Sequence, residues 1–206
     1  MTNKELFDLF KIDDLRYLSE AIMRTVLGNV DDRNEIYSKL LEINKYDLSY
    51  DWFQKIYEDE LAQRKLQKQD FTPNSVAKLT SLLTGNPKGK IYEPTAGNGS
   101  MIIADWWNRC LQSDFPLMHF PSDNIIQCCE LSGAAIPILL LNLSIRGIMG
   151  YVFHADVLEQ TIKNKYILLN RNNDTLTFSE IIEDKDNKLF IHDTTNDSLM
   201  KTKKII

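Results

Sequence analysis

The sequence lacks any apolar run long enough to cross a bilayer. Its longest mainly apolar stretch, Ile136 to Leu143, is far shorter than the ~20 residues that a membrane-spanning helix needs. The first residues, Thr2 to Glu5, are polar and do not resemble the charged and then apolar start of a signal peptide. The sequence therefore predicts a cytoplasmic protein with no membrane partner.

Cysteine and histidine are also scarce. The cysteines, Cys110, Cys128 and Cys129, are odd in number, and the adjacent pair falls in an apolar segment where neighbouring side chains of a strand face opposite sides. We expect them to be buried, reduced thiols. The three histidines are scattered without the spacing of metal ligands, so no metal site is predicted.

An excess of positive charge is absent as well. There are 24 Lys and Arg against 29 Asp and Glu, which gives a formal net charge of −5. Binding to nucleic acid depends largely on the neutralisation of phosphates by basic side chains. If this chain acts on DNA, we expect a partner subunit to supply much of the contact.

What the sequence does contain is a glycine loop after a short apolar segment, in residues 90 to 100, KIYEPTAGNGS. This pattern predicts a strand, a tight loop and a helix. Gly97 and Gly99 allow a sharp turn and close approach of a ligand to the main chain, and the first amides of the helix point to the same place. We therefore expect a ligand at residues 93 to 100.

The loop does not suit a nucleotide phosphate. It has neither the Gly-Lys-Ser/Thr ending of a P-loop nor the third glycine of the dinucleotide fingerprint. Glu93 instead places a carboxylate beside the glycines, and a carboxylate favours a cation such as a sulfonium or ammonium group. This favours S-adenosylmethionine, although a lone Gly-x-Gly also occurs in strand-to-helix turns that bind nothing.

The segment Glu93 to Met101 resembles motif I of adenine-specific (N6) DNA methyltransferases, in particular of the modification subunits of type I restriction systems. Phe71-Thr72-Pro73 resembles the segment of that family that closes over the cofactor, and Glu130-Leu131-Ser132 resembles its motif II. These pieces follow the order of the family over residues 70 to 170. The resemblance implies an α/β protein with a partial Rossmann-like S-adenosylmethionine-dependent methyltransferase fold, and the periodicity of the residues before it predicts an N-terminal helical region.

The predicted cofactor is S-adenosylmethionine, held by residues at the ends of the expected strands. Glu130, at the carboxyl end of a buried strand, is placed to grip a ribose diol. The resemblance implies that Asp156 accepts a hydrogen bond from the adenine amine; the alternatives are a solvated loop carboxylate for Asp156 and a simple helix cap for Thr72. The expected cofactor-binding residues are Phe71, Thr72, Pro73, Glu93, Pro94, Thr95, Ala96, Gly97, Gly99, Glu130, Leu131, Asp156 and Val157.

The catalytic motif implied by the resemblance is incomplete. In such enzymes the fourth strand ends in Asn or Asp, two prolines and an aromatic residue, which accept the protons of the target amine and stack on the flipped base. Here the strand expected at Lys165 to Leu169 is followed by Asn170-Arg171-Asn172-Asn173, so only Asn170 matches. The missing stacking platform alone is worth ~1–3 kcal/mol per base. We expect methyl transfer by this chain alone to be impaired or lost.

The organisation of the chain follows from its hydrophobic periodicity. Apolar residues at helical spacing predict three or four helices in residues 1–69. For residues 70–206 we expect a truncated methyltransferase-like domain without a target-recognition domain. Early strands are expected near residues 90, 127, 152 and 167 in parallel order. A hairpin turn is expected at Arg171 to Asp174, leading to strands at 175–178 and 188–192.

Three functions stay open on the sequence alone. The chain is a binding protein for S-adenosylmethionine that has lost methyl transfer, an active N6-adenine DNA methyltransferase subunit that needs a partner chain, or a methyltransferase for a small molecule or a protein. The sequence after Asn170 favours the first. A restriction-modification complex or a homo-oligomer is the expected partner.

Overall fold

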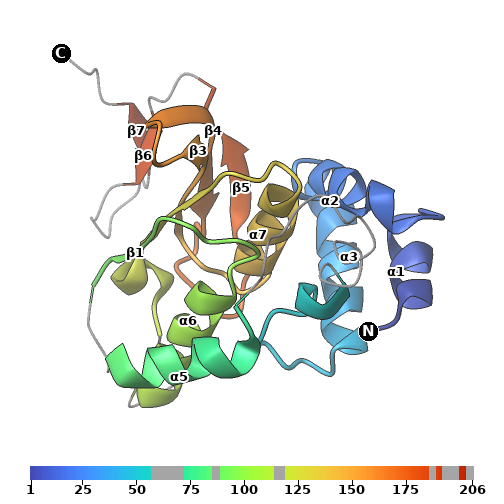
Figure 1. The fold of residues 1–206 in the computed structure, drawn as a ribbon, viewed down its shortest axis with the longest axis horizontal. Coiled ribbons are helices and arrows are strands. Elements are labelled where there is room, and N and C mark those ends of the chain that lie inside the picture. The colour runs from blue at the N-terminus through green and yellow to red at the C-terminus, as the bar shows by residue number, and fades with distance from the viewer. Residues whose placement is uncertain (57–71, 85–88, 114–118, 186–188, 192–199, 203–206) are drawn as a thin grey trace.

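The computed structural model describes residues 1–56, 72–84, 89–113, 119–185, 189–191 and 200–202. Helices in the N-terminal part lie on one side of a sheet in Figure 1, and further helices flank the sheet itself. The helices are α1 (Asn3–Phe10), η1 (Leu15–Tyr17), α2 (Leu18–Val26), α3 (Val30–Ile43), α5 (Asn74–Thr84), α6 (Ser100–Gln112), η3 (Pro121–Asn124) and α7 (Ala135–Ser144). The strands are β1 (Ile91–Glu93), β2 (Ile126–Glu130), β3 (Gly150–Asp156), β4 (Thr161–Leu169), β5 (Glu180–Glu183), β6 (Leu189–Ile191) and β7 (Met200–Thr202).

The N-terminal helices begin at recognisable caps. At α1, the Thr2 hydroxyl accepts the Glu5 amide while the Glu5 carboxylate accepts the Thr2 amide, which forms a capping box. At α3, the side chain of Asn29 accepts the amides of Asp31 and Asp32. Polar caps followed by apolar residues at helical spacing explain why this part of the chain is helical.

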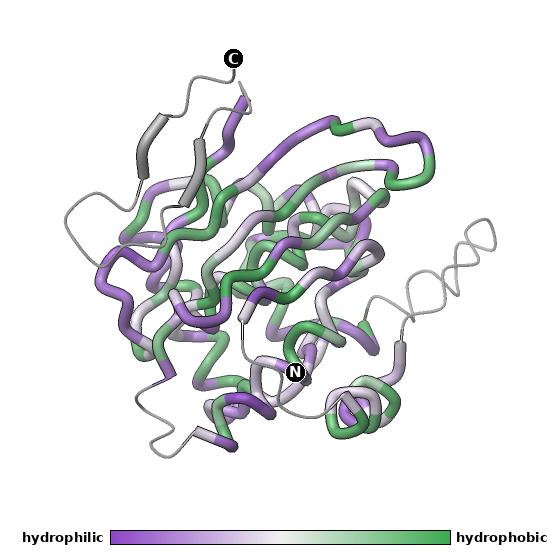
Figure 2. Tube along the Cα trace, turned by 90° about the vertical axis from the view of Figure 1, so that its left-hand side faces the viewer, coloured by the Kyte–Doolittle hydropathy of each residue, from purple (hydrophilic) through white to green (hydrophobic). Residues whose placement is uncertain are grey.

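Helix α7 joins the N-terminal helices to the sheet. Every residue of α7 is buried, because the helix lies between the strands and the N-terminal helices (Figure 1). Tyr37 of α3 and Ser144 of α7 share a hydrogen bond of 2.5 Å, and the Ser19 hydroxyl of α2 donates to the Ala134 carbonyl at 2.8 Å. One hydrophobic core therefore runs through both parts, as the green stretches in the middle of Figure 2 indicate.

The main sheet has the order β1-β2-β3-β4-β5. The first three strands are parallel, as expected, but β4 runs antiparallel to β3, and β5 runs antiparallel to β4. The prediction of a parallel fourth strand is therefore wrong. The chain turns directly from Asp156 at the end of β3 to Thr161 at the start of β4, and so short a connection only permits an antiparallel hairpin.

The predicted hairpin after β4 exists with a different second strand. Residues 175–178 form a turn and a bend instead of the expected strand, and β5 starts later, at Glu180. Strand β6 lies inside the strand expected at residues 188–192 and pairs with β7 in a separate two-stranded sheet.

Cys110, Cys128 and Cys129 are all free and buried. Among the described residues, no helix combines the length and apolar character that crossing a membrane requires.

Candidate cofactor site

The glycine loop connects β1 to α6 and crosses the end of β2. The Ala96 amide donates to the Cys129 carbonyl at 2.9 Å, which fixes the loop over the neighbouring strand. Gly97 and Gly99 have φ angles of +55° and +95°, in the left-handed region that favours glycine. A Cβ atom at Gly99 would lie 2.9 Å from Cδ1 of Leu139, so a larger residue there would also displace this side chain of α7.

Glu130 ties the end of β2 to this loop. Its Oε2 accepts the Gly97 amide at 2.7 Å, and its Oε1 accepts the Ser132 amide at 2.7 Å. The side chain is buried, with 7% exposure, so these charge-assisted bonds are shielded from bulk water. Each carboxylate oxygen has a second lone pair, so Glu130 retains capacity to accept hydroxyl groups of a ligand.

Two further carboxylates stand at the ends of the adjacent strands. Oε1 of Glu93, at the end of β1, accepts the Thr95 amide at 3.0 Å and the Thr95 hydroxyl at 3.3 Å. Oδ1 of Asp156, at the end of β3, accepts the amides of Leu158 and Glu159, both at 3.0 Å. Because β1, β2 and β3 are parallel, all three carboxylates lie at the same edge of the sheet, the one formed by the carboxyl ends of these strands.

Apolar side chains follow two of these carboxylates. Leu131 comes directly after Glu130 and is 50% exposed, and Val157 comes directly after Asp156 and is 38% exposed. The His154 ring nitrogen Nε2 lies 3.1 Å from the Leu131 carbonyl, which connects the segments after β2 and within β3. A planar, apolar ring with polar edges suits a surface of this composition.

The segment that resembles the family's cofactor lid is described only in part. Phe71 lies outside the described residues. The Thr72 carbonyl accepts the Gln54 side-chain amide at 3.1 Å, and the Pro73 carbonyl accepts the amides of Val76 and Ala77 at 2.9 and 3.0 Å. Thr72 and Pro73 therefore lead into α5, and Gln54 holds them to the N-terminal part of the chain.

The structure does not bring Asn170 to this edge. Leu168 of β4 pairs with Gly150, the first residue of β3, so Asn170 lies beyond the opposite end of the sheet from Asp156. Six strand steps separate Gly150 from Asp156, which corresponds to roughly 20 Å. The Asn170 side chain is fully buried, and its amide nitrogen donates to the carbonyls of Gly147, Asp174 and Thr177. Here the asparagine organises a turn.

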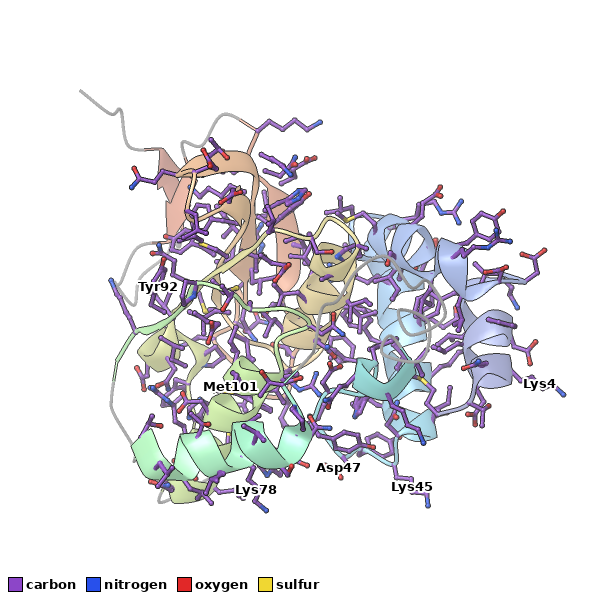
Figure 3. The ribbon with its side chains drawn as sticks, viewed as in Figure 1. Lys4, Lys45, Asp47, Lys78, Tyr92 and Met101 are labelled. Atoms are coloured by element: carbon purple, nitrogen blue, oxygen red, sulfur yellow. The ribbon has the colours of Figure 1, made fainter. Side chains whose placement is uncertain are left out.

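Two hollows lie beside α5 and α6. One of 340 Å³ is lined by Tyr50, Lys78 and Trp107 among others, and none of the strand-end carboxylates contributes to its wall. The other, of 250 Å³, has Glu93 and Met101 in its wall. Figure 3 shows Tyr92 at the outer side of the sheet and Lys78 pointing outward from α5.

No cluster of His, Cys, Asp and Glu in the described part of the chain is arranged to hold a metal ion.

Sequence analysis missed a set of buried polar residues behind the glycine loop. They come from the loop after α3, from the glycine loop and the start of α6, and from α7 and the turn after it, and they are Asp51, Asn98, Ser100, Asn142 and Arg146. One signal was available: Asn142 and Arg146 are four residues apart in an otherwise apolar helical segment, and such residues share one helix face. Nothing in the sequence connects either of them to Asp51.

The fold and the site define a class of protein: an α/β protein in which a glycine loop and acidic residues meet at the carboxyl ends of parallel strands. The donors and acceptors at this edge fit a cationic, ribose-containing ligand, since carboxylates accept hydroxyl groups and attract positive charge.

Comparison with known families identifies this class further. A model of the N-6 DNA methylase family matches residues 48–178, which is more than half of the chain. The chain therefore belongs to the N-6 DNA methylase family. The matched residues include the glycine loop, Glu130, Asp156 and Asn170. No curated protein matches the chain.

Proposed function

We propose that this chain binds S-adenosylmethionine at the carboxyl ends of β1, β2 and β3 and does not methylate DNA on its own. The observation that carries the proposal is the 2.7 Å hydrogen bond from the Gly97 amide to Glu130. It holds the glycine loop and the acidic strand end as one preorganised unit, and N6 DNA methylases generally use S-adenosylmethionine.

In this proposal each group of the cofactor meets a matching side chain. The ribose hydroxyls donate to the remaining lone pairs of Glu130, and the adenine ring lies against Leu131 and Val157 with its amine directed to Asp156. Glu93 favours the positively charged end of the cofactor. When bound, the cofactor supplies an activated methyl group, and the residues named here bind and orient it.

Loss of methyl transfer is proposed because the acceptor set is missing. Asn170 lies at the far end of β3 from Asp156, and its side chain is already saturated with hydrogen bonds inside a turn. The sequence contains no two adjacent prolines, so the Asn-Pro-Pro-aromatic arrangement does not occur elsewhere in it. Removal of one stabilising donor from an active site costs ~10²–10³ in rate, and here several elements are absent.

An active subunit completed by a partner chain is the second candidate. It is favoured by the position of β1, which among the described residues pairs only with β2 and leaves its outer backbone edge open to another strand. The net charge of −5 agrees with DNA contact through a partner. The resemblance to modification subunits of type I restriction systems makes such a complex the partner that we propose for this case.

Titration calorimetry with S-adenosylmethionine, followed by a labelled-methyl transfer assay on unmethylated DNA, tests both candidates. We expect saturable binding by the wild-type chain and no transfer. Absence of binding would overturn the first part of the proposal. Robust transfer by the isolated chain would overturn the second part, and transfer only after addition of a partner subunit would establish the second candidate.

A further inference from the structure

A buried polar cluster lies directly behind the glycine loop. We call it the Asp51 cluster, and its members are Asp51, Asn98, Ser100, Asn142 and Arg146, each at most 7% exposed. They come from three segments that are far apart in the sequence: the loop after α3, the glycine loop with the first residue of α6, and α7 with the turn that follows it. Buried polar groups in such a cluster are expensive unless they are hydrogen-bonded, so their partners define what the cluster does.

Asp51 is connected to the glycine loop by two routes. Its Oδ1 accepts the Asn142 side-chain amide at 2.8 Å, and the same amide nitrogen donates to the Asn98 carbonyl at 2.9 Å. Its Oδ2 accepts the Ser100 hydroxyl at 3.4 Å, at the first residue of α6. One bridge therefore reaches the backbone between Gly97 and Gly99, and the other reaches the helix start that faces the proposed ligand.

Arg146 fixes the other side of the cluster. Its guanidinium donates to the carbonyls of Leu48 and Tyr50 at 3.0 and 2.6 Å, which holds the loop before Asp51 on the turn that follows α7. It also donates to the Asn142 carbonyl at 2.6 Å and to the Asn142 Oδ1 at 3.3 Å. With Oδ1 facing a cation, the Asn142 nitrogen must face the acceptors Asp51 and Asn98, so Arg146 sets the orientation of the bridging amide.

The electrostatics of the cluster depend on burial and on pairing. Burial raises the pKa of Asp51, while the bonds from Asn142 and the Phe53 amide and the nearby charge of Arg146 oppose that rise. Burial likewise lowers the pKa of Arg146 to about 10, against the influence of Asp51. The side chain of Asn98 makes no hydrogen bond among the described residues. Its side-chain amide nevertheless lies close to Asp51 and opposes the rise of the Asp51 pKa.

We infer that Asp51 is a positioning residue for the glycine loop, which couples the segment before α5 to the proposed cofactor site. Through Asn142 it fixes the Asn98 carbonyl, and through Ser100 it fixes the start of α6. The family match begins at residue 48 and so includes this loop. The part of the inference that concerns affinity rests on the proposed binding of S-adenosylmethionine; the part that concerns loop geometry does not.

The test compares Asp51→Ala with Asp51→Asn by amide hydrogen exchange of residues 96–100 in the free protein and by calorimetry with S-adenosylmethionine. Asp51→Ala removes the acceptor, so we expect about tenfold faster exchange in the loop and about tenfold weaker binding. Asp51→Asn keeps an oxygen for the Asn142 and Phe53 amides, so both quantities should stay within about threefold of wild type.

Tyr37→Phe is the matched control, because it removes another buried hydrogen bond to α7, from α3 to Ser144, without a contact to the loop. It should lower stability and leave loop exchange and affinity unchanged. Wild-type loop exchange in a folded Asp51→Ala variant would overturn the inference, whether or not the cofactor binds. If Asp51→Ala does not fold, Ser100→Ala decides: about threefold faster loop exchange supports the inference, and unchanged exchange overturns it.

Discussion

Replacement of Glu130 by alanine tests the site at its most connected residue. The side chain accepts two backbone amides, those of Gly97 and Ser132, each at 2.7 Å, and it is buried. A hydrogen bond to a charged group contributes about 1.5–3 kcal/mol. Because water partly satisfies the freed amides, we expect Glu130→Ala to lower the free energy of unfolding by about 2–4 kcal/mol.

The same substitution should weaken binding of S-adenosylmethionine. Two ribose hydroxyls are expected to donate to the carboxylate, and their loss, together with a looser Gly97 turn, corresponds to at least about tenfold in affinity. Glu130→Gln keeps one acceptor oxygen but turns an amide group toward an N–H donor, so its affinity should lie between those of wild type and Glu130→Ala.

Urea denaturation followed by circular dichroism measures the first effect, and titration calorimetry of the folded variants measures the second. Glu20→Ala is the control, because it removes the same charge from an exposed position of α2. Its affinity should equal that of wild type, and its stability should fall by at most about 1 kcal/mol, the contribution of a carboxylate in the first turn of a helix. A Glu130→Ala variant that binds S-adenosylmethionine with wild-type affinity would refute the assignment of Glu130 to the cofactor site.

Three further predictions concern other parts of the molecule. Nζ of Lys165 lies 3.0 Å from Oδ2 of Asp184 in a buried ion pair, and Asp184→Asn breaks this pair. The free energy of unfolding, measured by urea denaturation, should fall by about 3–5 kcal/mol. The Lys165→Met/Asp184→Leu double variant should recover most of that loss. Asn170→Ala removes the hydrogen bonds that organise the turn after β4, so it should lower the denaturation midpoint without changing affinity for S-adenosylmethionine. Burial raises the pKa of the Cys110 thiol to about 12, so the unfolded chain loses this proton at lower pH than the folded chain. Stability should therefore fall as the pH rises above the ordinary thiol pKa of 9.0. Cys110→Ala should flatten that fall, and a pH profile of stability unchanged by the substitution would contradict this prediction.

The glycine loop and the strands around it could be predicted because their signals are local. Gly97 and Gly99 adopt left-handed backbone angles that the sequence favours by residue type, and the apolar run before Glu130 forms the expected buried strand. The orientation of β4 could not be predicted in the same way. Its first residues, Thr161 to Lys163, are exposed and lack a buried-strand pattern, so the sequence predicts a strand only from Lys165 and does not reveal the short hairpin that joins it to β3.

The Asp51 cluster lay beyond prediction for a different reason. A buried aspartate, asparagine and arginine look like ordinary polar residues until the chain brings them together, and the contacts from Asp51 to Asn142 and Ser100 span segments far apart in the sequence. Only the polar pair Asn142 and Arg146 in an apolar helix gives a hint. Tertiary packing, which decides their partners, leaves no local pattern.

The proposed separation of cofactor binding from methyl transfer rests on the direction of β4. Parallel strands β1, β2 and β3 deliver Glu93, Glu130 and Asp156 to one edge, whereas an antiparallel β4 delivers Asn170 to the other. We therefore expect changes at Asn170 to act on the fold alone, and changes at Glu130 to act on both the fold and the proposed cofactor site. With the cofactor placed as proposed, a methyl acceptor would have to reach the strand ends beside Gly97, near β1, whose outer side is open among the described residues. If a partner restores transfer, Asn170→Ala should leave the restored rate unchanged in folded protein, and its loss in that variant would show that the asparagine reaches the substrate.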